Sequence, residues 1–331
     1  MRRITTATHA VDLFGVGKHG FKDGDLANGI VPTDFNADWP NQIQEEVARV
    51  VEGAGLALDG ADLSQLLKAI RKLVGGDRGV RGLIGVNNAA TPTTQFDLKA
   101  DSVVFRDSVT GEGHSIASVG TLTVNVATAG PVANGRDQAG AFGAASWLHF
   151  YFIYNPTTAT VATIGSASAP PAGPALPAGY TAWAYAGTAR FNGSSQIVPM
   201  YFRGSRALYQ AAVNSLNGGT ATTSTAVSVS TLVPPNALAF DLLIRKIAGT
   251  TGAGPSLGVS HFIELVAAQT FMINEFGVTG TASTGQTQAA PGPLVQVPNV
   301  GQSYLYRLSI SVGTASATHD VLGYTLPNGG E

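Results

Sequence analysis

The charged residues of this 331-residue chain are concentrated in its first quarter. Residues 1–82 hold 10 of the 19 lysines and arginines and 11 of the 21 aspartates and glutamates. After Gly75-Gly76 the sequence turns to Thr, Ser, Ala, Val and Gly with prolines at turns, a composition typical of β structure. The sequence therefore predicts a small α-helical head over residues 1–82, followed by a long, mainly β body.

The composition excludes several classes of function. A net charge of −2 offers no basic surface for phosphates, so we expect no nucleic-acid partner. The chain has no cysteine, which excludes thiolate catalysis and cysteine-held zinc or iron–sulfur centres. The longest apolar run, residues 147–154, is well short of the roughly 20 residues that cross a bilayer, so no membrane insertion is expected. Because no apolar stretch follows Met1-Arg2-Arg3, we also expect synthesis in the cytoplasm without a signal peptide.

Two short helices are predicted in the head. The first covers residues 40–52, with Asp38 able to cap it, and the second covers residues 63–74 and stops at the glycine pair. Helices of this length are marginal alone in water, so their apolar stripes must pack. They could pack on each other or on copies in neighbouring chains around an axis, and the sequence leaves both open. The predicted helix-packing or oligomer residues are Ile43, Val47, Val50, Leu63, Leu66, Leu67 and Ile70.

The body reads as strands throughout. Residues 147–154 form a continuous apolar strand that enters a turn at Asn155-Pro156, and residues 161–164 are its hairpin partner. We predict a linker with short strands over 83–115, a β-sandwich domain over 116–214 and a C-terminal β-sandwich domain over 215–331. The polar segment 214–220 is taken as the boundary between the sandwiches. Further strands are predicted at 122–126, 181–191, 196–202, 226–232, 238–247, 259–266, 270–276, 304–312 and 318–326.

Catalytic motifs are absent from the sequence. The spacing Gly15-x-Gly17-x-x-Gly20 matches a dinucleotide loop, but no strand-and-helix unit surrounds it, so it predicts a turn. Glu264 and Glu275 could approach across a hairpin as a glycosidase pair, although outward-facing strand positions explain them more simply. We therefore expect no enzyme activity and no cofactor.

The histidines are scattered, with no two at metal-ligand spacing. We predict no metal site within the chain. One histidine per chain could still supply three ligands on a threefold axis, and His319, followed by Asp320, is the first candidate for that role.

Aromatic residues cluster between 147 and 202 and hold the best binding signal in the body. Sugar-binding surfaces use aromatic faces of this type. Packing in the core is the alternative role for such aromatic residues, and the sequence leaves it open. The candidates for a host-surface binding site are Tyr180, Trp183 and Tyr185.

The head carries a recognisable string of residues. It runs Gly15-x-Gly17-Lys18-His19-Gly20-Phe21-Lys22-Asp23-Gly24-Asp25, and continues through Trp39-Pro40-Asn41 to Gln44-Glu45-Glu46. This pattern, over roughly residues 11–73, resembles the N-terminal segment of tailed-bacteriophage tail-fibre and prophage tail proteins. Pro40 departs from the pattern and affects only the expected start of the helix. The resemblance implies virion docking through Gly15, Gly17, Lys18, Gly20, Phe21, Asp23, Gly24, Trp39, Asn41 and Glu45.

Segments 146–156, 176–181 and 190–195 of the body are similar to a β-domain of phage tail proteins. The resemblance implies a homotrimeric virion component of the phage tail. Its head would dock onto a tail-tip or baseplate protein, and its β domains would contact a host-surface glycan or protein receptor, or carry a distal fibre protein. The low charge of the body independently suits subunits that bury large mutual interfaces. The alternative function is a tailspike depolymerase that cleaves host-surface polysaccharide.

Overall fold

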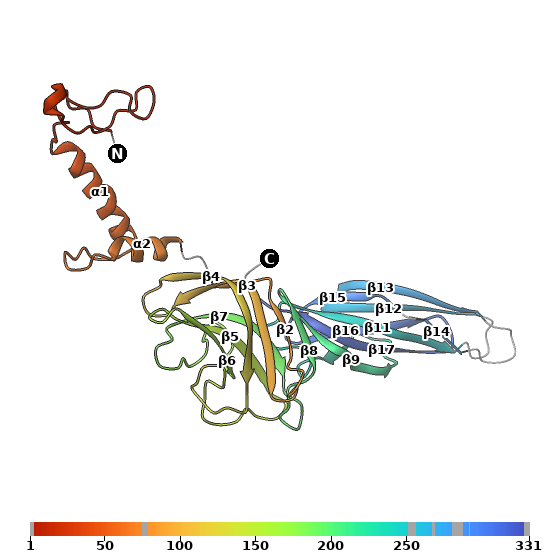
Figure 1. Cartoon of the computed structure of the whole chain (residues 1–331). Helices are drawn as coiled ribbons and strands as arrows, with labels where there is room; N and C mark the ends of the chain where they lie inside the picture. Colours follow the sequence, from red (N-terminus) through yellow and green to blue (C-terminus); the bar gives the residue numbers. More distant parts are fainter. Residues whose placement is uncertain are drawn as a thin grey trace. The chain divides into compact units, whose positions relative to one another are not determined.

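The computed structural model describes residues 3–74, 78–250, 256–266, 269–279, 287–290 and 292–327 (Figure 1). The chain divides into two compact units, Met1–Gly76 with Thr110–His114, and Asp77–Val109 with Ser115–Glu331. From here on, "head" means the first unit and "body" the second. The chain is mainly β, with its helices near the N-terminus, which confirms the predicted fold class.

The head contains a 3-10 turn, η1 (Leu26–Asn28), and two helices, α1 (Asp38–Gly53) and α2 (Gln65–Val74). Both predicted helices are present with shifted starts. α1 begins at Asp38, and its N-cap, Ala37, makes no side-chain hydrogen bond, so the predicted capping by Asp38 is wrong. Pro40 is tolerated because the first turn of a helix needs no backbone N–H from it. Among the described residues, no helix combines the length and apolarity of a membrane span.

The body is built from two antiparallel sheets. The larger, with 13 strands, contains β1 (Gly79–Arg81), β2 (Ile84–Asn87), β3 (Gln95–Asp107), β4 (Gly113–Asn125), β5 (Trp147–Asn155), β6 (Thr160–Ser166), β7 (Ala182–Arg190), β8 (Met200–Arg203), β9 (Arg206–Gly219), β11 (Ala239–Thr250), β14 (Thr287–Ala290), β15 (Leu294–Pro298) and β17 (Thr314–Thr325). The smaller contains β10 (Thr225–Ser228), β12 (Ser256–Val266), β13 (Gln269–Thr279) and β16 (Ser303–Ile310). The predicted hairpin of β5 and β6 is confirmed, with Tyr154 opposite Val161.

One hydrogen-bonded path crosses the boundary predicted at 214–220. The strand order β17–β9–β8–β2–β3 joins strands from both sides of it, and β9 continues through Asn214 to Gly219. The pairing of β9 with β17 shifts register repeatedly here, and the Asn214 side chain donates to the Asp320 carboxylate at 3.0 Å. The polar residues that suggested a loop therefore occupy bulges inside a strand.

The segment predicted as a linker with short strands, 83–115, contains the 13-residue strand β3. Its buried and outward positions alternate, with Phe96 and Leu98 in the core and Asp97, Lys99 and Asp101 facing outward. The outward charges hid the apolar alternation in the sequence, so the linker prediction is corrected here.

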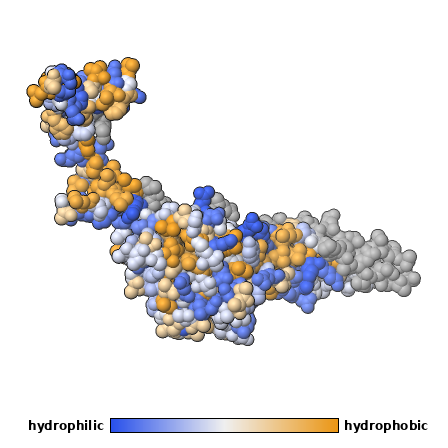
Figure 2. Space-filling model, viewed as in Figure 1, coloured by the Kyte–Doolittle hydropathy of each residue, from blue (hydrophilic) through white to orange (hydrophobic). Residues whose placement is uncertain are grey.

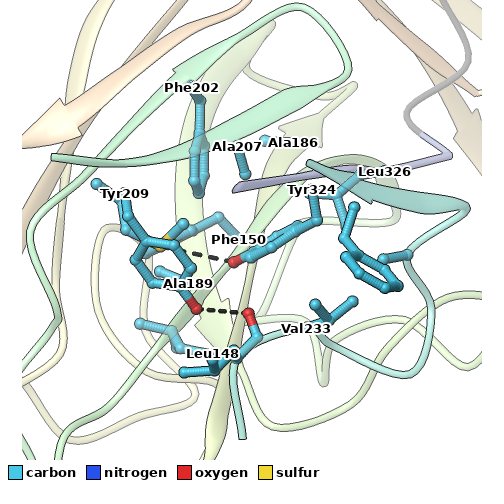
Figure 3. Packing of buried hydrophobic residues seen from close by; sticks show 14 of the residues in the cluster. Leu148, Phe150, Ala186, Ala189, Phe202, Ala207, Tyr209, Val233, Tyr324 and Leu326 are labelled. Atoms are coloured by element: carbon cyan, nitrogen blue, oxygen red, sulfur yellow. Dashed lines mark hydrogen bonds between the residues drawn. The ribbon is translucent and has the colours of Figure 1, made fainter. Parts of the chain in front are cut away.

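A single hydrophobic core fills the body. Phe96 of β3 stacks on Phe150 of β5 with ring centroids 4.6 Å apart. Figure 3 shows Tyr324, from β17, among residues that include Phe150 and Tyr209. The Tyr324 hydroxyl donates to the Thr188 carbonyl of β7 at 2.8 Å. The two halves of the β sequence therefore share one interior.

Candidate functional site: the exposed apolar surface of the head

The head leaves most of its apolar side chains uncovered. Its buried apolar residues are Ile4, Val51, Ala54 and Ala69. Between residues 11 and 73, by contrast, sixteen large apolar side chains are exposed, against five in the described body. Figure 2 shows apolar surface gathered over the N-terminal loops and over α2. The head is therefore the part of the described chain with the most exposed apolar side chains, a feature that marks sites of protein interaction.

The glycine-rich string folds as a turn, as predicted. The backbone N–H of Gly17 donates to the Asp12 carboxylate at 2.6 Å, and Ala10 and Gly20 exchange backbone hydrogen bonds at its base. Gly17 has a φ of 73°, which favours glycine. A Cβ on Gly20 would lie 2.5 Å from the end of the Leu13 side chain, which would have to move to admit a larger residue there. These glycines shape a loop with no strand-and-helix unit around them.

A second turn follows at residues 25–30. The Asp25 carboxylate accepts hydrogen bonds from the backbone N–H groups of Ala27 and Asn28 and from the Asn28 side chain, the last at 2.6 Å. The hydrogen bond from the Asn28 side chain, with others from the backbone, lowers the pKa of Asp25. Asp25 and Ile30 pair at the base of the turn, and Leu26 is fully exposed at its tip.

The start of α1 carries an aromatic cluster. Trp39 lies edge-on to Phe21 and Phe35, with ring centroids 4.9 and 5.8 Å away. Phe21 and Phe35 remain exposed. Of the docking residues predicted on α1, Asn41 and Glu45 line a shallow polar hollow. The remaining docking residues, Gly15, Lys18, Asp23 and Gly24, are exposed in the loops.

The helices pair through small side chains rather than through the predicted stripe. Val51, Ala54 and Ala69 are buried between α1 and α2. Leu63 is 99% exposed, and Leu66, Leu67, Ile70 and Val47 are also exposed, while Ile43 and Val50 are half-buried. α1 and α2 therefore pack on each other, which is one of the two arrangements that the sequence left open. Val50 of the predicted stripe packs against this contact, and most of the other stripe residues remain exposed.

The predicted aromatic binding surface of the body is wrong. Trp183 is 6% and Tyr185 5% exposed, because β7 is buried on both faces. The Arg78 guanidinium lies 3.7 Å from the Trp183 ring centroid, and the Tyr185 hydroxyl accepts a hydrogen bond from Asn236 at 2.8 Å. Tyr180 is half-buried. These residues stabilise the interior.

The suggested axial histidine is also internal. His319 has its Nδ1 2.7 Å from the Tyr304 hydroxyl and its Nε2 2.9 Å from Nε2 of His261, and both histidines are fully buried. His319 therefore cannot serve on an axis between chains in this conformation. In the described part of the chain, no three His, Asp or Glu side chains are grouped to hold a metal.

Asp241, Glu264 and Asp320 of the C-terminal half are buried and paired with arginines. Glu264 accepts from the Arg307 guanidinium at 2.8 Å, and Asp320 lies 3.0 Å from that of Arg245. The register places Glu264 opposite Thr270 and Glu275 opposite Ser260, so the two glutamates are not cross-strand neighbours.

The sequence reasoning missed the two turn tips. Val16 is 94% exposed between Gly15 and Gly17, and Leu26 directly follows the capping Asp25. An apolar residue set between glycines, or just after a capping aspartate, is the signal that could have identified them.

Comparisons with known proteins give one short match. No family model matches the chain. Over 74 residues it is 42% identical to an uncharacterized protein, StfP, of Escherichia coli strain K12, a match that covers 22% of this chain and 35% of that protein. The chain thus spans about a third of the length of this curated relative.

Similarity to solved structures is low. An infectious bursal disease virus (Gt strain) structure gives a TM-score of 0.21 at 8% identity, covering 76% of this chain and 58% of the other. The Cry4Aa toxin from Bacillus thuringiensis gives 0.19 at 10% identity, covering 75% and 52%. At these TM-scores neither structure bears on the fold or the function.

Proposed function

We propose that this chain is a structural and adhesive protein of a bacteriophage tail, a fibre or baseplate component of the virion. Its head docks onto a tail-tip or baseplate protein, and its β body contacts the host surface or carries a further fibre protein. The observation that carries the proposal is the contrast in exposed apolar surface between head and body.

The head's surface supports an assembly role because a small unit gains most of its stability from buried apolar area. With only four apolar side chains buried and sixteen large ones exposed, it lacks the core that an independent domain of this size needs. It has the surface expected of a segment completed by other protein.

The sequence pattern supports a particular kind of assembly, the phage tail. The ordered string from Gly15 to Glu46 resembles the attachment segment of tail-fibre proteins, and the structure places its loop residues in two hydrogen-bonded turns. The 42% identity to StfP extends over 74 residues, 22% of this chain. StfP is uncharacterised, so it supplies no activity to transfer.

Self-association is proposed through α2. Its exposed side chains Leu66, Leu67, Ile70 and Leu73 lie on one side of the helix, and three copies around an axis would bury them. The low charge of the body favours contacts between subunits through the body surface. The apolar side chains of the body are largely buried within the described chain, however, so we place the proposed contact between subunits in the head.

The protein is proposed to act without catalysis. Asp137, Asp241, Glu264 and Asp320 of the body are buried and hydrogen-bonded or paired with arginine. A depolymerase needs a carboxyl pair open to its sugar substrate. Incubation with host-surface polysaccharide should release no new reducing ends, and release above that of a heat-treated sample would favour the depolymerase.

The experiment uses the full chain with a C-terminal tag, produced in bacterial cells that assemble tailed phage particles. Particles are purified on a density gradient and probed for the tag. The proposal expects the chain in the particle fraction, with the tag at the tail in electron micrographs. A chain found wholly outside the particles would overturn it.

A further inference from the structure

Two turns of the head share one construction. In residues 12–18 and 25–30, which we call the braced turns, an aspartate side chain accepts hydrogen bonds from the backbone of the turn, from one N–H group in the first and from two in the second, and one apolar side chain stands at the tip. Val16 and Leu26 at the two tips are among the most exposed apolar side chains of the described chain.

We propose that Val16 and Leu26 are the contact residues through which the head binds a different protein, by inserting into apolar pockets. The pocket for Leu26 is bordered by lysine or arginine side chains. This inference rests on the proposed function and names the chemistry of the docking partner.

The braces make the turns suited to binding. Asp12 accepts from the Gly17 N–H at 2.6 Å, and the Lys18 N–H donates to the Gly15 carbonyl at 2.7 Å. Asp25 holds two backbone N–H groups of its own turn. A loop already ordered in its bound shape loses little entropy when it binds, so more of the burial energy of the tip appears as affinity.

The negative charge around Leu26 favours a partner whose pocket has positively charged side chains at its border. Residues 22–34 contain Asp23, Asp25 and Asp34 against one cation, Lys22, so the formal charge of this segment is −2. A partner with a cationic border complements these carboxylates, and an acidic border is repelled. The turn around Val16 contains both Asp12 and Lys18, so its pocket needs no particular charge.

The partner is a different protein rather than a second copy of this chain. The braced turns precede α1, whereas α2 packs near the other end of α1, about 24 Å away along a 16-residue helix (Figure 1). The α2 stripe is the surface proposed for self-association. The hollow on the head that a second copy could offer is lined by Asn41, Gln42, Glu45, Glu46 and Arg49, so it has no apolar residue to receive a leucine and its net charge is negative.

The test compares single variants of the full chain for incorporation into purified particles. Each is produced without wild-type chain, so that mixed oligomers cannot carry it in, and is compared with wild-type chain produced in the same way. We expect Val16→Ser and Leu26→Ser to lower incorporation about tenfold or more, because burying an exposed valine or leucine is worth at least that factor. Val109→Ser is the matched control, since Val109 is 91% exposed in the described body, and it should incorporate like wild type.

Two variants of Asp25 separate the effect of its hydrogen bonds to the turn from the effect of its negative charge. Asp25→Asn keeps an oxygen for the backbone N–H groups but removes the charge, whereas Asp25→Ala removes both. We expect Asp25→Ala to lower incorporation more than Asp25→Asn, and Asp25→Asn more than Val109→Ser. Equal incorporation of Asp25→Asn and wild type would overturn the cationic border.

A benzophenone photocrosslinker at position 26 of the full chain identifies the partner. The expected adduct contains a chain of another sequence. An adduct with this chain itself, or a smaller oligomer for Leu26→Ser in light scattering, would overturn the inference by making the tip a self-contact. Wild-type incorporation of both tip variants would overturn it too, while leaving the proposed function intact. If wild-type chain is missing from particles, it is the proposed function that fails.

Discussion

Lowering the pH from 7.5 to 5 is expected to destabilise the body, because three histidines are held there in a neutral state. Burial lowers the pKa of His149 and of His261 to about 4. Burial, with the neighbouring His261, lowers the pKa of His319 to about 3. The ordinary pKa is about 6.5, so between pH 6.5 and about 4 the unfolded chain binds protons that the folded chain does not.

The sign follows from that difference in protons bound. The free energy of unfolding falls as the pH falls through this window, because protonation stabilises only the unfolded chain. At pH 5 each histidine contributes a loss of about 2 kcal/mol relative to pH 7.5, and the three together about 6 kcal/mol. A typical domain has a total stability of about 5–15 kcal/mol, so the change is large enough to measure.

The assay is urea unfolding at several pH values, followed by the fluorescence of Trp147 and Trp183 of the body. His149→Gln should remove about a third of the pH-dependent loss, and Val109→Ser, at an exposed position of the body, is the control that should remove none. An unchanged free energy of unfolding between pH 7.5 and 5 would refute the reasoning. So would a pH dependence that survives intact in His149→Gln.

Three further outcomes are expected. Phe150→Ala should lower the free energy of unfolding by about 3–5 kcal/mol, whereas Val109→Ala at an exposed site should change it by less than about 0.5 kcal/mol in the same urea assay. Gly323→Ala should cost about 1–3 kcal/mol, because its Cβ would lie 2.3 Å from the Ala207 carbonyl oxygen across β9 and β17; a stable variant contradicts that pairing. Leu67→Glu should reduce the mass of the oligomer in light scattering without changing the stability of the body, and an unchanged mass would argue against self-association through α2.

The sequence predicted those elements whose pattern is local. Both helices show an apolar stripe, and β5 is a continuous apolar run followed by a turn, so neighbouring residues alone identify them. β3 and β9 were missed because their outward residues are charged or amidic, as at Lys99 and Asn214, and only the pairing of distant strands makes these segments regular.

The candidate site was predictable in place but not in detail. The glycine pattern indicated a turn near Gly15 and Gly17, and the structure has one. The aromatic residues of β7 were misassigned because exposure depends on which layers cover a strand, and β7 is covered on both faces. Leu26 is not part of a periodic apolar pattern in the sequence, and its full exposure in the folded head can be seen only in the structure.

The most direct measurement of the central claim is the amount of chain on purified particles when residues 1–76 are deleted. The body has its own core, so the deleted chain is expected to stay folded, with an unchanged urea midpoint. The account predicts that this folded body no longer joins particles that take up the full chain. A folded body that joins them as well as the full chain does would contradict the assignment of docking to the head.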